Sequence, residues 1–422
     1  PLEYQDDTYV YVIATAGMRL LSLERQKAIY DAAATKLKPL LEREELGFKV
    51  LRKNFRTATG LEEGFWGFLA ANFLQGRMGL SMTLAQKQSA FSGVLDLGGS
   101  STQIAYKCGG LDSDSVEKEN VFVHSFLGYG AQLARKKLEA AVSEENPCDF
   151  KGYQRTKEGT EEKLIGSGDA NKCRDVIRKH LVTNSDCKEP PCFFNNVHKP
   201  SKPCGNFLGI SLYYFATDCL RKVVGTYLNV APSESSLVHG YLSHFPRPSV
   251  EEIKAAADLM CSRHWDTAKT WEHDETPDVT SWSGRCFEVN YIATVIQYGY
   301  GMPPTSHNVT FVKDLHGSEV EWTLGAFIEE NLRLSSDPTA ISTRGIVEPT
   351  EYMPTDSIAM PAIFIVILLS IPGFLICYKT GKDPYTLVTN AFIVPSKPMS
   401  SVESLELQPT EQQATVNVVV GE

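Results

Sequence analysis

The sequence predicts an α/β protein with more than one lobe, and three observations lead to this prediction. The chain has 422 residues, which is more than one typical domain holds. Short apolar runs that are typical of buried strands, such as Tyr9–Ile13, alternate with longer segments of helical periodicity, such as Leu20–Leu41. Hydrophobic residues make up 42% of the chain, enough to fill the cores of such lobes.

Further helices and strands are expected in order along the chain. Val121–Val142 predicts a strand that runs into a helix, and the polar composition of residues 112–120 and 151–162 predicts loops. The tail 379–422 has few aromatic residues and is predicted to be disordered. Apolar or amphipathic patterns predict helices at Phe65–Leu74, Phe207–Leu228, Val250–Cys261, Phe287–Gln297 and Trp322–Leu332.

The most informative segment is Gly93–Tyr106, which predicts a β-hairpin with a turn of glycines and hydroxyls. Paired glycines let backbone N–H groups approach an anion closely, because no Cβ stands in the way. Hydroxyl and amide side chains add polar groups, and the carboxylate of Asp96 suits a hard divalent cation. The pattern therefore indicates a cradle for phosphate and metal, built from Asp96, Gly98, Gly99, Ser100, Ser101, Thr102 and Gln103.

Charge and cysteine content narrow the class of protein. A net charge of −10 and the lack of a basic run argue against a protein that binds nucleic acid. Ten cysteines, none in paired zinc-type spacing, indicate disulfides and an oxidising compartment. Cys187 and Cys192 flank two prolines and predict a local disulfide loop. Asn308-Val309-Thr310 is a glycosylation sequon and predicts a glycoprotein.

One apolar segment predicts a membrane helix. Residues 358–378 contain no charged side chain and would span about 31 Å as a helix, the thickness of a bilayer core. Acidic residues precede the segment, and Lys379 and Lys382 follow it, so the positive-inside rule places the large body outside the cytosol. The alternative is a buried helix of a soluble core.

Three other short segments add to the hairpin. Ala14–Leu21 follows the first strand and opens a helix, where free N–H groups can face an anion. Thr59–Gly67 places two carboxylates beside glycines, and Phe287–Gly301 ends in Tyr-Gly-Tyr-Gly. Each is common alone, but their order and spacing resemble the ecto-nucleoside triphosphate diphosphohydrolases, the apyrase family. His124–Gly130 and Trp322–Gly325 resemble two further family segments, and the resemblance covers residues 5–335.

The resemblance implies an actin-like fold of two ribonuclease-H-like lobes with the active site in the cleft between them. By analogy the first lobe holds residues 1–59 and 314–345, and the second lobe holds residues 60–313. A stalk at 346–357, the transmembrane helix at 358–378 and the cytosolic disordered tail at 379–422 would follow. We expect the plasma membrane rather than the Golgi or another internal compartment, and a role in purinergic signalling. Association into a homo-oligomer through the membrane span is left open.

The resemblance also implies an activity and its residues. Nucleoside tri- and diphosphates would be hydrolysed to monophosphate and phosphate by water, with Ca²⁺ or Mg²⁺ as cofactor. Glu63 would be the catalytic base, Ser101 would hold the attacking water, and Asp96 would bind the metal through water with Gln103 beside it. The alternative base is Glu62, whose simpler interpretation is a solvated carboxylate favoured by the helix dipole. The terminal phosphates would be bordered by Thr15, Ala16, Gly17, Gly98, Gly99 and Ser100.

For the nucleobase, the resemblance points to an aromatic side chain that stacks on it. Phe215 is the first choice and Tyr214 the second, while core packing of their helix is the alternative. Ala131 stands where animal cell-surface members often have a basic residue, so the base selectivity stays open.

The chain also departs from the family. Members carry a first phosphate loop of the Asp-Ala-Gly-Ser-Ser type, and none of the 13 residues before Ala14 resembles it. We therefore expect an active native gene product but a nearly inactive 422-residue chain. The family's cysteine pattern implies the disulfides Cys148–Cys173, Cys187–Cys192 and Cys261–Cys286, leaves Cys108, Cys204 and Cys219 unassigned, and suggests Cys204–Cys219.

Two rival functions come from other classes. One is a non-catalytic membrane protein that binds nucleotide, which the missing loop favours and the presence of Glu63 and Ser101 disfavours. The other is an actin-fold kinase for a small metabolite, which the cysteines and the membrane segment disfavour.

Overall fold

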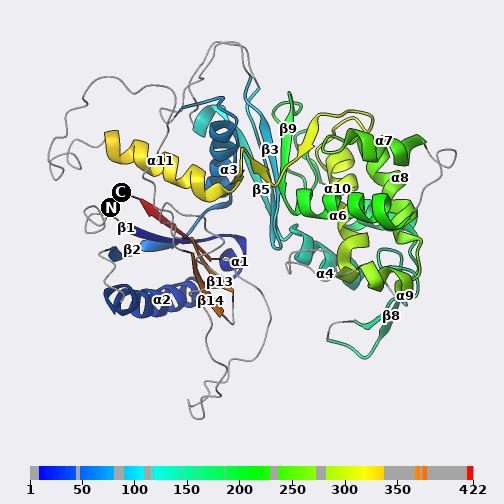
Figure 1. The fold of residues 1–422 in the computed structure, drawn as a ribbon, viewed down its shortest axis with the longest axis horizontal. Helices are drawn as coiled ribbons and strands as arrows, with labels where there is room; N and C mark the ends of the chain where they lie inside the picture. Colours follow the sequence, from blue (N-terminus) through cyan, green and yellow to red (C-terminus); the bar gives the residue numbers. More distant parts are fainter. Residues whose placement is uncertain are drawn as a thin grey trace. The chain divides into compact units, whose positions relative to one another are not determined.

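The computed structural model of the chain divides into two compact α/β units, which are described separately (Figure 1). The first unit holds residues 1–59 and 326–422, and the second holds residues 60–325. The structure describes residues 9–43, 48–79, 90–108, 116, 118–142, 144–157, 159–184, 186–228, 236–271 and 282–336, and the strands at 366–370, 373–377 and 416–421.

The first unit is built on a strand–helix–strand motif. Strand β1 pairs in parallel with β2, and on its other side in antiparallel fashion with β15. The helix α2 that connects β1 to β2 covers the sheet with an apolar face, which includes the buried side chains of Tyr30 and Leu41. These elements are β1 (Tyr9–Ala14), α1 (Ala16–Arg19), α2 (Leu23–Arg43), β2 (Lys49–Thr57) and β15 (Val416–Gly421).

The second unit contains a five-stranded mixed sheet in the order β10-β9-β3-β4-β5. The first three of these strands in the chain form an antiparallel meander, and β9 and β10 add in parallel with β3. The strands are β3 (Gly93–Leu97), β4 (Ser101–Tyr106), β5 (Phe122–Leu127), β9 (Phe207–Ser211) and β10 (Val309–Phe311). The hairpin predicted at 93–106 is therefore confirmed.

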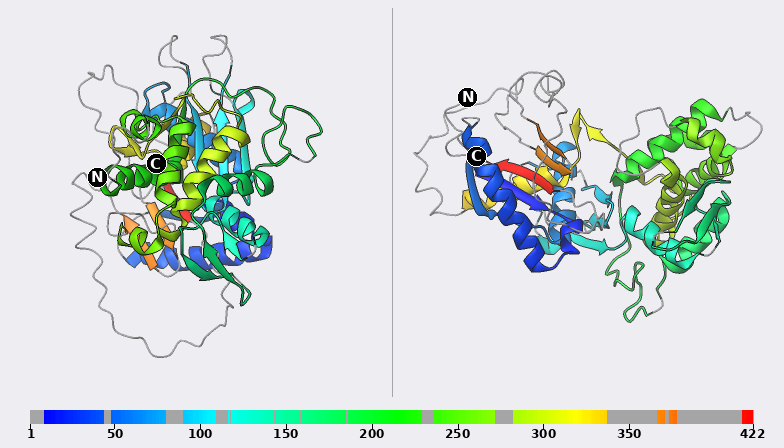
Figure 2. Two further views of the ribbon diagram at one scale, coloured as in Figure 1. Left: turned by 90° about the vertical axis from the view of Figure 1, so that its right-hand side faces the viewer. Right: turned by 90° about the horizontal axis from the view of Figure 1, so that it is seen from below.

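Helices cover both faces of this sheet. α3 (Gly60–Leu74) packs on one face, across β3, β4 and β5. On the other face α6, α8 and α10 pack against one another, as the views of Figures 1 and 2 show. The further helices are α4 (Ala131–Ala141), α5 (Ala170–His180), α6 (Leu212–Tyr227), α7 (Ser236–His244), α8 (Val250–Cys261), α9 (Trp265–Ala268), α10 (Arg285–Thr294) and α11 (Trp322–Ser336).

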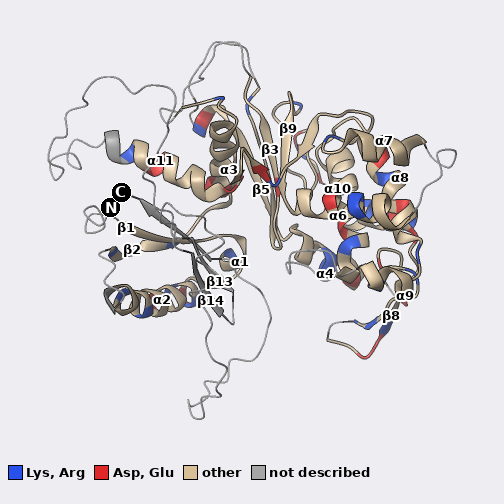
Figure 3. Cartoon of the chain, in the orientation of Figure 1, with Lys and Arg blue, Asp and Glu red and all other residues tan. Residues whose placement is uncertain are grey.

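Short strands and turns complete the unit. A second sheet has the order β6-β8-β7, and β11 pairs with β12 as a small hairpin. Lys, Arg, Asp and Glu are interspersed over the helices of this unit, as expected for solvated surfaces (Figure 3). The short elements are β6 (Glu145–Asn146), β7 (Gln154–Thr156), β8 (Lys163–Gly166), β11 (Asp314–Leu315), β12 (Ser318–Glu319) and a π-helical turn at Val295–Gly299.

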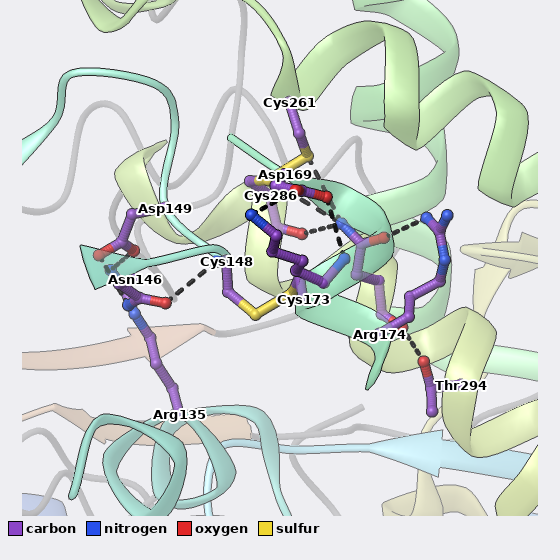
Figure 4. The surroundings of a disulfide bond; sticks show 12 residues. Arg135, Asn146, Cys148, Asp149, Asp169, Cys173, Arg174, Cys261, Cys286 and Thr294 are labelled. Atoms are coloured by element: carbon purple, nitrogen blue, oxygen red, sulfur yellow. Dashed lines mark hydrogen bonds and ion pairs between the residues drawn. A yellow bond between two sulfur atoms is a disulfide. The ribbon is translucent and has the colours of Figure 1, made fainter. Parts of the chain in front are cut away.

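Four disulfides cross-link the second unit, and two of them lie close together in its core (Figure 4). Asn290 on α10 connects their surroundings. Its Nδ2 donates to the carbonyl of Cys286 over 2.8 Å, and its Oδ1 accepts from Arg174 on α5 over 2.7 Å. The four pairs are Cys108–Cys204, Cys148–Cys173, Cys187–Cys192 and Cys261–Cys286.

The three pairs implied by the family resemblance are confirmed, and the suggested Cys204–Cys219 bond is wrong. Cys204 bonds to Cys108, because the end of β4 and the beginning of β9 lie at the same edge of the sheet. Cys219 is a free, buried thiol on α6, where removal from water raises its pKa to about 12.

Most predicted helices are present, but the one at 207–228 begins later than expected. Its first five residues form β9, which lies between β3 and β10 and is buried in the sheet. Ser211 then adopts a left-handed backbone conformation with φ of 56°, which separates the strand from α6. A buried parallel strand and a buried helix are both uninterrupted apolar runs, so the pattern alone does not separate them.

The predicted transmembrane helix at 358–378 is wrong where the structure describes this segment. Val366–Ser370 (β13) and Gly373–Cys377 (β14) pair as antiparallel strands, and the other residues of 358–378 lie outside the described ones. Valine and isoleucine favour strands, and Pro372 cannot donate a helical hydrogen bond. Within the described part of the chain, no helix has the length and apolar character to cross a membrane.

The remaining C-terminal predictions are tested only at one place. Residues 416–421 form β15, so the prediction of a wholly disordered tail at 379–422 is wrong there. Four of these six residues are valines, and valine favours extended pairing. The stalk at 346–357 lies outside the described residues.

Disulfides that close long loops should contribute more to the free energy of unfolding than those that close short loops. Removing Cys148–Cys173 by alanine at both positions should cost about 3.5 kcal/mol, because the bond closes a loop with a sequence separation of 25. All five tryptophans lie between residues 60 and 325, so tryptophan fluorescence during urea unfolding reports the second unit.

The matched control is the double alanine variant of Cys187–Cys192. Its sequence separation is only 5, and the expected cost is about 2 kcal/mol. A control variant that loses as much stability as the Cys148–Cys173 variant would contradict this ranking.

Candidate active site

The register of the second unit's sheet places three polar side chains in a row across neighbouring strands. Asp96 on β3 pairs with Gln103 on β4, and Gln103 pairs with Ser125 on β5. Residues directly opposite one another in antiparallel strands point to the same face of a sheet. Ser101 shares this face with Gln103, because the two positions are two residues apart on one strand.

Gln103 connects the hydroxyls of this row. Its buried Nε2 donates to Ser101 Oγ over 2.7 Å and to Ser125 Oγ over 3.1 Å. Since both amide hydrogens are used in this way, the amide oxygen Oε1 is the atom of Gln103 that can accept from water or face a cation. The structure thus brings the predicted residues Asp96, Ser101 and Gln103 together, and adds Ser125.

The predicted catalytic base lies at the start of α3, the helix that packs across β3, β4 and β5. Glu63 is in the first turn of α3 and only 7% exposed, whereas its rival Glu62 is half-buried. The next residue, Gly64, packs directly against the strands: a Cβ there would lie 2.6 Å from Val123 Cγ1 and 3.5 Å from Gln103 Cβ. A larger side chain at this distance would require Val123 or the helix to shift, so glycine allows the first turn of α3 to approach β4 and β5 this closely.

The turn between β3 and β4 is held by the beginning of α4. The carbonyl of Gly98 accepts from Ala131 N over 2.9 Å, and the carbonyl of Gly99 accepts from Gln132 N over 3.0 Å. The carbonyl of Ser100 accepts from Gly128 N over 2.8 Å. In a trans peptide the C=O and the following N–H point in opposite directions. The N–H groups that follow these three carbonyls therefore point away from these partners, as an anion cradle requires.

Asp96 is a half-buried carboxylate at the end of β3. Removal from water raises its pKa, and a hydrogen bond from Ser211 and one from the backbone N–H of Leu97 oppose the rise. A further bond holds the hairpin from its other face, where Thr102 Oγ1 donates to the carbonyl of Asp96 over 2.7 Å.

The predicted late segment 287–301 reaches the hairpin through one tyrosine. The Tyr300 and Thr102 hydroxyls lie 3.1 Å apart, and both residues are fully buried. The segment therefore supports the hairpin from its packed face.

Glu321 is a residue of this region that the sequence analysis missed. It directly precedes α11, where the indole of Trp322 stacks on Trp66 of α3 with 5.7 Å between ring centroids. Burial raises the pKa of Glu321, and the charges of Glu319 and Asp96 raise it further. A signal was available, because a carboxylate directly before the recognised Trp-Thr-Leu-Gly segment stands at a helix start.

The two aromatic candidates for the nucleobase occupy the first turn of α6, just after Ser211. The side chains of Tyr214 and Phe215 are half-buried, with their rings 5.5 Å apart in an edge-on arrangement. Tyr213 is fully buried and bonded to Tyr300, so it belongs to the core. Tyr214 and Phe215 thus keep exposed surface on which a planar ring can stack.

The other predicted phosphate-binding residues belong to the first unit and are described there. Thr15 precedes the short helix α1, and its carbonyl accepts from Met18 N over 3.1 Å. Ala16 and Gly17 are buried inside α1, whose end is tied by Arg19 Nη1 to the carbonyl of Ala58 over 3.2 Å.

The chain is similar in sequence to several nucleotide phosphatases. Nucleoside-diphosphatase mig-23 of Caenorhabditis elegans is 25% identical, over 86% of this chain and 69% of that protein. Ectonucleoside triphosphate diphosphohydrolase 1 of Mus musculus is 30% identical, over 77% of this chain and 66% of that protein. Golgi apyrase of Schizosaccharomyces pombe is 25% identical, over 77% of this chain and 60% of that protein.

Solved structures with a similar arrangement are more distant in sequence. A nucleoside triphosphate hydrolase from Neospora caninum has a TM-score of 0.46 at 16% identity, covering 69% of this chain and 67% of that chain. A Ppx/GppA family member from Aquifex aeolicus has a TM-score of 0.39 at 12% identity, covering 78% of this chain and 99% of that chain.

The model of one protein family matches residues 1–337, about four-fifths of the chain. The chain belongs to the GDA1/CD39 (nucleoside phosphatase) family.

Proposed function

We propose that the protein hydrolyses nucleoside di- and triphosphates to the monophosphate and phosphate, by attack of water on the terminal phosphoryl group. The observation that supports this best is the position of Glu63. It is a buried carboxylate at the start of α3, and the next residue, Gly64, packs on Gln103. We also propose that the second unit is a ribonuclease-H-like lobe, because three antiparallel strands followed by parallel ones suit that topology.

In this proposal Glu63 accepts the proton of the attacking water, and the Ser101 hydroxyl helps to hold that water. A general base must lie within hydrogen-bond reach of the water, directly or through one further group. The bond from Gln103 to Ser101 Oγ uses a lone pair of the hydroxyl oxygen and orients the O–H. The backbone N–H groups of Gly99, Ser100 and Ser101 would stabilise the negative charge that develops on the phosphoryl oxygens.

The residues at the end of β3 suit a hard divalent cation, Ca²⁺ or Mg²⁺. The donors are oxygens: the carboxylate of Asp96, the amide oxygen of Gln103 and nearby hydroxyls. No lysine or arginine among the described residues shifts the pKa of either Asp96 or Glu321, although both carboxyls are removed from water. When bound, the cation would offset the negative charge of the phosphates. Asp96 and Gln103 would hold it through water.

The proposal also covers how the substrate is bound and in which compartment the protein lies. Gly98, Gly99 and Ser100 are proposed to border the terminal phosphates, and Phe215 or Tyr214 to stack on the base. Four disulfides among the described residues indicate an oxidising, extracellular or lumenal environment. Asn308 of the sequon is exposed just before β10, where a glycan can be attached.

The direct test is phosphate release from ATP and ADP by the complete protein, with Ca²⁺ and with EDTA. Glu63→Gln keeps the shape of the side chain and removes the base, so kcat should fall by about 10²–10⁴-fold. Glu62→Gln is the matched control: it changes the neighbouring, half-buried carboxylate and should keep near wild-type activity. EDTA should abolish release by the wild-type protein.

Two outcomes would contradict the proposal. If Glu62→Gln lost activity and Glu63→Gln kept it, the proposed assignment of the base to Glu63 would be wrong. Tight nucleotide binding without phosphate release, by a folded protein with Ca²⁺ present, would favour a nucleotide-binding protein that does not turn over.

The pH dependence of the reaction should depend on Glu321. Burial raises the pKa of Asp96, and a protonated Asp96 cannot bind a cation, so activity should fall as the pH decreases through that raised pKa. The charge of Asp96 raises the pKa of Glu321. Because repulsion between two carboxylates is mutual, Glu321→Gln should remove a charge that disfavours ionised Asp96 and so lower the pKa of Asp96. The acidic limb of kcat/KM at limiting Ca²⁺ should therefore move to lower pH.

Glu319→Gln is the control for this shift. Glu319 is an exposed residue of β12 that pairs with Lys313 over 3.8 Å. An acidic limb that stays in place in Glu321→Gln, or that moves by the same amount in both variants, would show that Glu321 does not act on Asp96.

A further inference from the structure

A second group of metal-binding side chains lies in the second unit, on elements that the proposed reaction does not use. His244 is the last residue of α7, Glu252 is in the first turn of α8, and His307 precedes β10. Each offers a ligand atom, and these three atoms lie within 4.8 Å of one another. Two imidazoles and one carboxylate at such distances match the ligand number of an open zinc site.

The carboxylate forms the inner part of this group, and the imidazoles form its rim. Glu252 is only 5% exposed, whereas the side chains of His244 and His307 are 52% and 41% exposed. His244 Nδ1 lies 2.7 Å from Glu252 Oε1, and His307 Nδ1 lies 3.8 Å from Glu252 Oε2. The two rings are edge-on, with 4.6 Å between their centroids. A cation can therefore enter from solvent and meet a buried negative charge.

Local hydrogen bonds hold two of the three side chains in place. Glu252 belongs to a capping box: its Oε2 accepts from Ser249 N over 2.7 Å, and Ser249 Oγ accepts from Glu252 N over 3.3 Å. His307 Nδ1 donates to the carbonyl of Arg247 over 2.6 Å. A histidine whose Nδ1–H is bonded to a carbonyl keeps the lone pair of Nε2 for a metal, which is the usual outer support of a zinc ligand.

The group is separate from the Asp96 hairpin in position and in chemistry. Val309 of β10 pairs with Phe207, which in turn pairs with Gly93, so the beginnings of β10, β9 and β3 share one edge of the sheet. His307 precedes that edge, whereas the Gly98–Ser100 turn follows the opposite end of β3. The Asp96 region offers oxygen donors, which suit Ca²⁺ and Mg²⁺, while imidazole nitrogen favours Zn²⁺ and similar transition metals.

We propose that His244, Glu252 and His307 bind one Zn²⁺ ion, with solvent at the remaining position. The ion would tie the end of α7 and the beginning of α8, whose ligands are eight residues apart, to the segment that leads into β10. Because the metal binds only the folded arrangement, its binding should also stabilise the second unit in proportion to the free Zn²⁺ concentration.

The test is calorimetric titration of Zn²⁺ into the complete, purified protein at neutral pH, with Ca²⁺ in excess to occupy oxygen-only sites. The wild-type protein should bind one Zn²⁺, and its thermal midpoint should rise with Zn²⁺. Glu252→Gln removes the anionic ligand but retains a capping-box residue, so the fold is expected to persist. Since loss of even an outer partner weakens metal binding 10–100-fold, Glu252→Gln and His307→Gln should each weaken Zn²⁺ by at least about tenfold.

The matched control is His180→Gln, which removes an exposed histidine at the end of α5 and should leave Zn²⁺ affinity unchanged. Thermal midpoints without Zn²⁺ show whether each variant is folded, and Ca²⁺-dependent phosphate release from ADP should be the same in Glu252→Gln as in the wild type. That readout separates this proposal from the proposed hydrolase function. The proposal would be overturned if the wild-type protein did not bind Zn²⁺, or if folded Glu252→Gln and His307→Gln bound Zn²⁺ as tightly as the wild type.

Discussion

The rest of the candidate site depends on one close approach, that of the first turn of α3 to strands β4 and β5. Gly64 lies so near Val123 that a methyl group would come within 2.6 Å of Cγ1. This contact sets how closely the first turn of α3 approaches β4 and β5, and the buried Glu63 belongs to that turn. A larger residue would push the helix away from the strands, and protein interiors accommodate such changes poorly.

The sheet supplies the second half of the geometry through its register. Because side chains alternate between the faces, Asp96, Gln103 and Ser125 line one face, while Leu95 and Ile104 enter the core on the other. A slip of one residue would move every polar group of the row into the core. The bond from Thr102 to the carbonyl of Asp96 and the hold of α4 on the Gly98–Ser100 turn both oppose such a slip.

The sequence predicted the parts of this site that have local signatures. The hairpin at 93–106, the carboxylates of the first turn of α3 and the helices that follow could be recognised from glycine placement and periodicity. Features made by contacts between distant segments could not. Glu321 interacts electrostatically with Asp96, more than two hundred residues earlier in the chain. Cys108 bonds to Cys204 only because the end of β4 and the beginning of β9 lie at the same edge of the sheet. The residues 366–377 show a third case, since an uncharged apolar run fits a membrane helix and a strand pair equally well.

The most direct measurement of the central claim is a double-mutant cycle between Gly64 and Val123, read as Ca²⁺-dependent phosphate release from ADP. Gly64→Ala should reduce kcat, because the added methyl group would displace the first turn of α3, which carries Glu63, away from Val123. Val123→Ala removes the Cγ1 atom that the methyl group would meet, so the double variant should recover much of the lost activity. Full activity in Gly64→Ala, or a folded double variant as inactive as Gly64→Ala alone, would contradict the account.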